Sequence, residues 1–176
     1  MYQAETPFLT GLRMIRVKLL LSIQMTCFCF GVEQVPPPWG FVFDDWAGDP
    51  LDVIVYIPAG AHKNTKILMV VPGASRDTQR FHASWLSFAK EDTFAVVTIG
   101  ASKKYFPDEY SYNAGNAITP KGKPVDNNLW LFTAIEKVFQ SVKKRHGIET
   151  KKFYLFGHSA GGGFVHRYML FMPEAP

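Results

Sequence analysis

The most restrictive feature of this chain is the segment Gly157–Gly161, which reads Gly-His-Ser-Ala-Gly. It follows a short apolar run, Phe153–Phe156, and precedes a segment with the apolar spacing of a helix. The order is therefore strand, tight turn and helix, with Ser159 at the turn. Glycine is expected on both sides because a Cβ there would collide with the strand or the helix. We expect a strained serine backbone with its hydroxyl clear of the sheet.

A serine presented in this way is suited to nucleophilic catalysis. The helix after it points free backbone N–H groups and the positive end of its dipole at the turn. The N–H of Ala160 is then available to an oxyanion that forms on a carbonyl carbon. The pattern predicts Ser159 as catalytic nucleophile, with Gly157 and Gly161 permitting the geometry of the turn.

Apolar runs and helical patterns alternate along the chain before this turn. Strands are predicted at 41–46, 51–57, 66–71, 94–99 and 152–156, and helices at 80–90, about 127–147 and 160–171. This alternation predicts an α/β fold, a mostly parallel sheet with helices on both faces. Residues 100–127 form a long polar and aromatic connection, and a loop of this length in a compact domain is usually functional.

Three segments resemble the α/β-hydrolase family, in particular its secreted esterases and polyester (polyhydroxyalkanoate) depolymerase-like members. They are Val71–Arg76 after the third strand, Tyr112–Asn116 in the long loop, and Phe156–Gly162 at the serine turn. The resemblance covers about residues 40–173 and implies the α/β-hydrolase fold, truncated after the helix that follows the serine. It also implies an oxyanion hole formed by the backbone N–H groups of Ala160 and Ala74. Relatives usually have His-Gly where this chain has Pro72-Gly73, a change that a backbone donor survives if the turn is kept.

Other side chains near these segments have two open roles each. Arg76 either faces the substrate or stabilises its loop, and Tyr112 and Asn113 either bind substrate or pin the long loop. His158 is expected to pack beside the serine and not to act as the base. His166 lies seven residues after the serine, about 10 Å along a helix, which is beyond the reach of a general base.

An activated serine needs a base that is held by an acid. In the family that the chain resembles, both residues come after the serine, and only 17 residues follow Ser159 here. We therefore expect the triad Asp and His beyond residue 176, and this 176-residue chain alone to be inactive. The alternative is a catalytically incomplete remnant that serves as a binding or split-assembly module.

The family's sheet order would also leave the predicted strand 152–156 as an unpaired apolar edge. An exposed edge of this kind invites pairing with another chain, so self-association of the truncated chain is expected. The helix after the serine is expected to lack part of its cover and to expose four of its large side chains: Phe164, Tyr168, Leu170 and Phe171.

Residues 1–31 have the pattern of a secretory signal peptide. The basic residues Arg13, Arg16 and Lys18 precede an apolar run, Leu19–Phe30. This run is too short for an ordinary membrane helix. Small residues predict cleavage between Gly31 and Val32, which leaves 32–176 as the N-terminal part of an α/β-hydrolase domain. A secreted or periplasmic protein without a stable membrane anchor is expected; a buried or interfacial N-terminal helix is the alternative.

Composition excludes some other functions. The net charge is +4, and no basic cluster is interleaved with aromatic residues, which argues against nucleic-acid binding. Both cysteines, Cys27 and Cys29, lie in the N-terminal segment, and the histidines lack metal-ligand spacing. No metal or cofactor is expected. The resemblance implies a small-molecule or polymeric ester substrate, although peptide hydrolysis uses the same serine turn.

Overall fold

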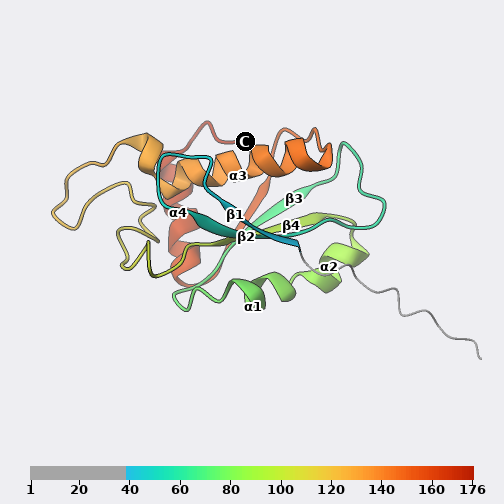
Figure 1. The fold of residues 1–176 in the computed structure, drawn as a ribbon, viewed down its shortest axis with the longest axis horizontal. Coiled ribbons are helices and arrows are strands. Elements are labelled where there is room, and N and C mark those ends of the chain that lie inside the picture. The colour runs from blue at the N-terminus through green and yellow to red at the C-terminus, as the bar shows by residue number, and fades with distance from the viewer. Residues whose placement is uncertain (1–38) are drawn as a thin grey trace, which may run out of the picture. The chain divides into compact units, whose positions relative to one another are not determined.

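The computed structural model describes residues 39–176 (Figure 1). The predicted signal peptide, residues 1–31, lies outside the described residues. The strands are β1 (Trp39–Phe43), β2 (Leu51–Tyr56), β3 (Ile67–Val71), β4 (Ala95–Gly100) and β5 (Tyr154–Gly157). The helices are α1 (Thr78–Ala83), α2 (Leu86–Glu91), α3 (Leu131–His146) and α4 (Ala160–Phe171), with a short 3-10 helix (Asn127–Leu129) before α3.

The strands form one sheet in the order β1-β2-β4-β3-β5. β1 and β2 pair antiparallel, as do β2 and β4, whereas β3 runs parallel to both of its neighbours, β4 and β5. Val70 of β3 lies opposite Thr98 on one side and Phe156 on the other. Among the described strands, β5 has one neighbour, so the strand before the serine turn lies at the edge of the sheet.

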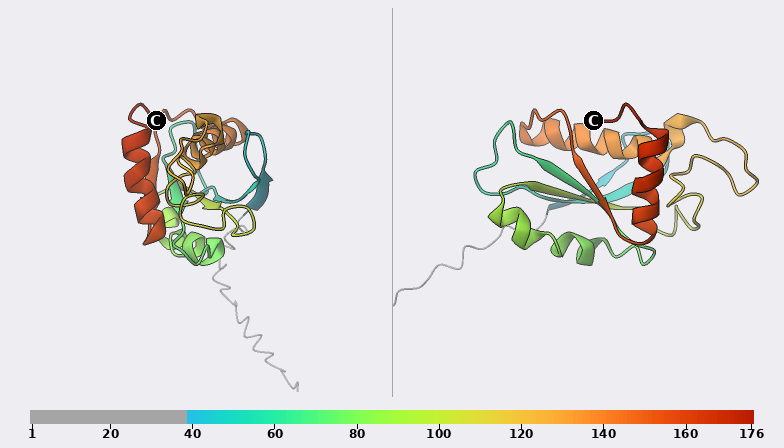
Figure 2. Two further views of the ribbon diagram at one scale, coloured as in Figure 1. Left: turned by 90° about the vertical axis from the view of Figure 1, so that its left-hand side faces the viewer. Right: turned by 180° about the vertical axis from the view of Figure 1, so that it is seen from behind.

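Helices cover both faces of this sheet (Figures 1 and 2). Side chains alternate between faces along each strand. Val97 and Met69 belong to the core that includes α3, and Val96 and Val70 pack on the opposite side with residues of α1 and α2. Because both faces are covered, all six residues of β4 are buried.

The amphipathic helix α3 supplies most of one core layer. Its buried stripe contains Leu131, Phe132, Ala134, Ile135, Val138, Phe139 and Val142. Gly147 follows the helix at φ 65°, in the left-handed conformation that ends helices, and its N–H donates to the carbonyl of Lys143.

The predicted helix 80–90 is two short helices, α1 and α2, that meet at Ser84 and Trp85. The Ser84 hydroxyl donates to the carbonyl of Phe81 at 2.8 Å, a local bond that competes with a continuous helix. Trp85 packs its ring 4.9 Å from that of Phe156 on β5. Trp85 is thus anchored to the sheet at the interruption between the two helices.

The expected exposure of α4 is wrong for two of its four side chains. Phe164 is fully buried, and its ring lies 4.8 Å from that of Phe132 on α3. Tyr168 is also buried, and its hydroxyl donates to Glu136 Oε1 at 3.1 Å. α3 therefore supplies the cover for these two residues. The other two are exposed, as expected: Leu170 and Phe171.

Candidate active site

Ser159 lies between β5 and α4 in a conformation that residues other than glycine rarely adopt. Its φ is 54° and its ψ is −115°. The turn is closed by a bond from Gly161 N–H to the His158 carbonyl at 2.9 Å, and Gly163 N–H donates to the Ser159 carbonyl at 3.0 Å. The serine is exposed. A strained backbone of this kind costs about 1–3 kcal/mol and is concentrated at functional sites.

The two glycines beside the serine lie where no side chain fits. A Cβ on Gly157 would come closer than 3.0 Å to the backbone of Gly161. A Cβ on Gly161 would come equally close to the carbonyl oxygens of Val71 and Pro72. The start of α4 is therefore packed directly against the end of β3.

The turn between β3 and α1 lies next to the serine turn. A Cβ on Gly73 would lie 3.2 Å from the His158 carbonyl oxygen. Arg76 N–H donates to the Gly73 carbonyl at 3.0 Å and so closes this turn. Ala74, in the middle of the turn, is exposed. Across residues 39–176, neither its backbone N–H nor that of Ala160 has a hydrogen-bond partner, so both donors are available.

Tyr112 of the long loop has the contacts of the loop-pinning role. It is 2% exposed, and its hydroxyl donates to the carbonyl oxygen of Pro72. The guanidinium carbon of Arg76 lies 3.2 Å from the centre of its ring. Burial raises the pKa of the Tyr112 hydroxyl, an effect that the charge of Arg76 opposes. The phenol therefore stays protonated and remains a donor.

Arg76 stacks on the ring of Tyr112, and Asn113 follows Tyr112 in the sequence. Arg76 Nη1 donates to the Ala101 carbonyl at 2.9 Å, and burial lowers its pKa while Tyr112 and Asp108 oppose this shift. These contacts are those of a loop-stabilising arginine. Asn113 Oδ1 is buried without a hydrogen-bond partner in the described chain. Contact of either residue with substrate stays a prediction.

The histidines near the serine are not arranged as a catalytic pair. His158 is exposed, and its ring lies 5.5 Å from that of Phe81, which is the packing expected of it. His166 is exposed on α4. Over the described range, no imidazole or carboxylate is hydrogen-bonded to the Ser159 hydroxyl, and no group of His, Cys, Asp and Glu side chains is arranged to hold a metal.

Sequence reasoning missed His82, which is buried on α1. Its Nδ1 lies 2.9 Å from Thr98 Oγ1 of β4, and its Nε2 has no partner among the described residues. Burial lowers the pKa of His82 to about 4, so the ring is neutral at pH 7. Its position at 82, next to Phe81 on the apolar side of the predicted helix, was the available signal.

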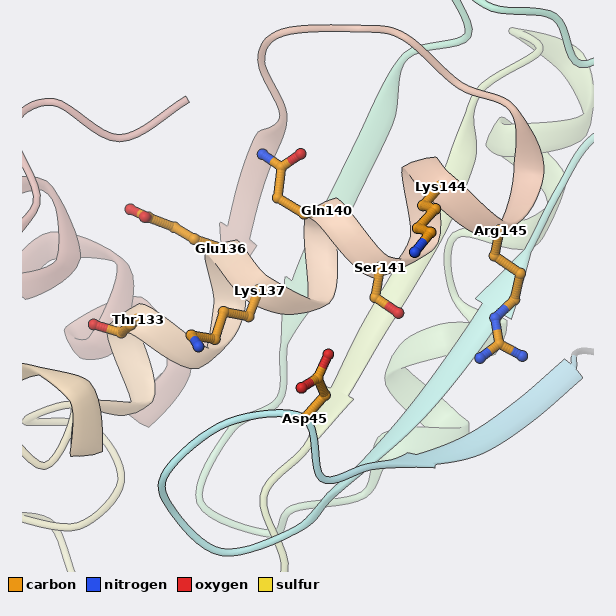
Figure 3. A pocket seen from close by; sticks show the side chains of 8 residues that line it. All are labelled: Asp45, Thr133, Glu136, Lys137, Gln140, Ser141, Lys144 and Arg145. Atoms are coloured by element: carbon orange, nitrogen blue, oxygen red, sulfur yellow. The ribbon is translucent and has the colours of Figure 1, made fainter.

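A wide cavity of about 800 Å³ lies away from the serine turn, between α3 and the segment after β1 (Figure 3). Asp45 points towards the helix across this cavity. The residues lining it carry charges of both signs: Asp45, Thr133, Glu136, Lys137, Gln140, Ser141, Lys144 and Arg145. None of the predicted site residues is among them. No helix within residues 39–176 has the length and apolar character to cross a lipid bilayer.

Known proteins share this fold. The structure of poly(aspartic acid) hydrolase-1 from Sphingomonas sp. KT-1 matches with a TM-score of 0.76 and 37% identity, over 78% of this chain and 52% of that protein. A poly(3-hydroxybutyrate) depolymerase from Bordetella parapertussis matches with a TM-score of 0.67 and 28% identity, over 75% of this chain and 46% of the depolymerase.

The bifunctional acetylxylan esterase/xylanase XynS20E of Neocallimastix patriciarum is 25% identical over 120 residues, which are 67% of this chain and 16% of that protein. No family model matches the chain. The chain is nevertheless an α/β-hydrolase by fold and by its resemblance to these proteins, as predicted. It spans about half the length of the two solved structures.

Proposed function

We propose that this chain is part of a serine hydrolase that cleaves carboxylic esters through an acyl-enzyme, with Ser159 as the nucleophile. The observation that carries the proposal is the exposed, strained serine at the start of α4, held between Gly157 and Gly161. Its hydroxyl oxygen attacks the carbonyl carbon and transfers its proton to a base. The alcohol leaves with that proton, and water then hydrolyses the acyl-serine.

The charge that develops on the substrate oxygen requires two aligned donors. We assign them to the backbone N–H groups of Ala160 and Ala74, which have no other partner among residues 39–176. The base and its acid are assigned to a His and an Asp that follow residue 176 in the complete protein. This assignment rests on the family resemblance.

The proposed substrate is an ester, either small or polymeric. Two relatives are named for ester cleavage, an acetylxylan esterase and a poly(3-hydroxybutyrate) depolymerase. The relative from Sphingomonas is named for hydrolysis of poly(aspartic acid), which makes an amide the competing substrate class. Secretion through residues 1–31 is part of the same proposal and rests on the sequence pattern of that segment.

A fluorophosphonate probe tests the nucleophile, because it reacts with an activated serine. The protein expressed from its full reading frame should be labelled, and the Ser159→Ala variant should not. The 176-residue chain alone should be labelled far more slowly, since no residue within 39–176 is placed to act as base on its serine. Labelling that persists in Ser159→Ala would place the nucleophile elsewhere. A well-folded full protein that resists the probe would support the non-catalytic alternative.

A further inference from the structure

One side chain of the long loop contacts residues of both backbone segments that carry the proposed oxyanion hole. The Tyr112 hydroxyl donates to the carbonyl of Pro72, at the start of the turn that carries Ala74. The Tyr112 ring lies 6.4 Å from that of Phe164, which is on α4, the helix that begins with Ala160. Tyr112 thus connects the turn that carries Ala74 to the helix that begins with Ala160.

The other end of the same turn rests on the face of Tyr112. The guanidinium carbon of Arg76 is 3.2 Å from the ring centre, and Arg76 Nη1 also donates to the Ala101 carbonyl at 2.9 Å. Residues 72 and 76 therefore both contact Tyr112, with Ala74 halfway between them.

Local hydrogen bonds close the turn. Arg76 N–H donates to the Gly73 carbonyl, Asp77 N–H donates to Ser75 Oγ, and Arg76 has a φ of 60°, which favours glycine. Ala74 and Ser75 are exposed. Strain of this kind persists only where surrounding contacts hold the residue. For Arg76, the stacking of its side chain on Tyr112 is such a contact.

We propose that Tyr112, with Arg76 stacked on its ring, is a positioning residue that fixes the direction of the Ala74 N–H relative to the Ala160 N–H. This inference rests on the proposed function. The hydroxyl bond to Pro72 fixes the turn, and the ring contact with Phe164 fixes the distance of that turn from α4. Loss of a whole oxyanion donor lowers kcat by about 10²–10³. A donor that is present but misdirected should therefore lower kcat less, by roughly 10- to 100-fold.

The test uses the protein expressed from its full reading frame and a p-nitrophenyl ester. Tyr112→Phe removes only the hydroxyl and keeps the ring beneath Arg76. It should lower kcat by about 10- to 100-fold with KM changed less than threefold, and weaken inhibition by a trifluoromethyl ketone, which forms a tetrahedral adduct, by a similar factor. Tyr110→Phe, in the same loop, is the matched control, because the Tyr110 hydroxyl has no partner within the described chain.

Arg76→Gly gives a second, independent reading. Glycine adopts a φ of 60° without strain, so the backbone can still form the turn, whereas the stacking on Tyr112 is lost. The variant should fold and should also lose kcat and inhibitor affinity together. Wild-type kcat in a folded Tyr112→Phe would overturn the proposal, and so would loss of thermal stability without any kinetic change, or failure of both variants to fold.

The same experiment separates this inference from the proposed function. If wild-type turnover survives Ser159→Ala, the proposed nucleophile is wrong before Tyr112 is considered. If turnover depends on Ser159 but not on the Tyr112 hydroxyl, the hydrolase assignment stands and the positioning role is wrong.

Discussion

Ser159 combines a reactive group with a backbone conformation that costs free energy. Its positive φ of 54° brings its hydroxyl to the surface directly before the first N–H groups of α4. A serine in an ordinary strand or helix would lie along the element and would not face those donors. The strain at this residue is therefore coupled to the proposed chemistry.

Ser159→Ala and Ser159→Gly separate the chemistry from the strain. Both should lower kcat for an ester by on the order of 10⁴–10⁶ in the complete protein. Ser159→Gly should be more stable than Ser159→Ala by about 1 kcal/mol, because glycine tolerates the positive φ but loses more chain entropy on folding. Ester hydrolysis and urea denaturation measure the two effects. Equal stability of the two variants would show that the turn is not strained in solution.

The buried His82 makes stability depend on pH. Its pKa in the folded protein is about 4, below its ordinary value of 6.5, so the unfolded chain binds more protons between these values. Stability should therefore be lost as the pH falls from 6.5 towards 4, by about 2–3 kcal/mol from this residue. Urea denaturation at pH 7, 5.5 and 4 measures the loss.

The variant His82→Gln should flatten this part of the pH profile, because a neutral amide cannot take up the proton. His166→Gln serves as the matched control, since His166 is exposed on α4. An unchanged pH profile in His82→Gln would mean that His82 is not buried as a neutral ring in solution.

At the scale of elements, local patterns predicted most of the fold. The strands 51–57, 66–71 and 94–99 match β2, β3 and β4 within about one residue at each end. Burial on both faces leaves a continuous apolar run, which is read from the sequence alone. The family resemblance at the serine turn predicted that the strand before it lies at the edge of the sheet, as β5 does among the described strands.

Contacts between distant elements could not be predicted in this way. Burial of Phe164 depends on Phe132, and the bond from Tyr112 to Pro72 joins residues 40 positions apart. A single sequence gives the type of each side chain but not which helix lies beside it. For this reason the candidate nucleophile was apparent at the start, whereas the loop-pinning contacts of Tyr112 emerged only from the packing.

The glycines of α4 test how closely that helix approaches β3. Gly161→Ala places a methyl group against the carbonyls of Val71 and Pro72 and should destabilise the protein by roughly 2–3 kcal/mol, with loss of activity. Gly162→Ala is the matched control, because its Cβ would have only an ordinary contact of 3.4 Å. Since alanine is the better helix former, Gly162→Ala should be neutral or stabilising by up to about 1 kcal/mol. Equal effects in thermal denaturation would contradict the close packing.

At the scale of the whole molecule, the sheet has two outer strands of different surroundings. Among residues 39–176, β1 pairs only with β2, and β5 pairs only with β3. The edge strand and the end of α4 expose large apolar side chains: Tyr154, Met169, Leu170 and Phe171. A recess of about 430 Å³ is lined by Tyr154 and Met169, together with residues that include Leu155 and Met172. The outer edge of β5 and these exposed apolar side chains provide a surface on which another chain can pair.

We predict that the 176-residue chain, expressed alone, self-associates through the β5 side. Sedimentation velocity should show a concentration-dependent increase in mass at micromolar protein. Tyr154→Lys combined with Leu170→Lys should shift the chain towards monomer, because each charge would have to be desolvated in the interface. The matched control combines Val42→Lys on β1 with Phe88→Lys on α2, since these side chains are 60% and 54% exposed on other surfaces. If both pairs of lysines reduce association equally, the effect comes from added net charge and the assignment to the β5 side is wrong.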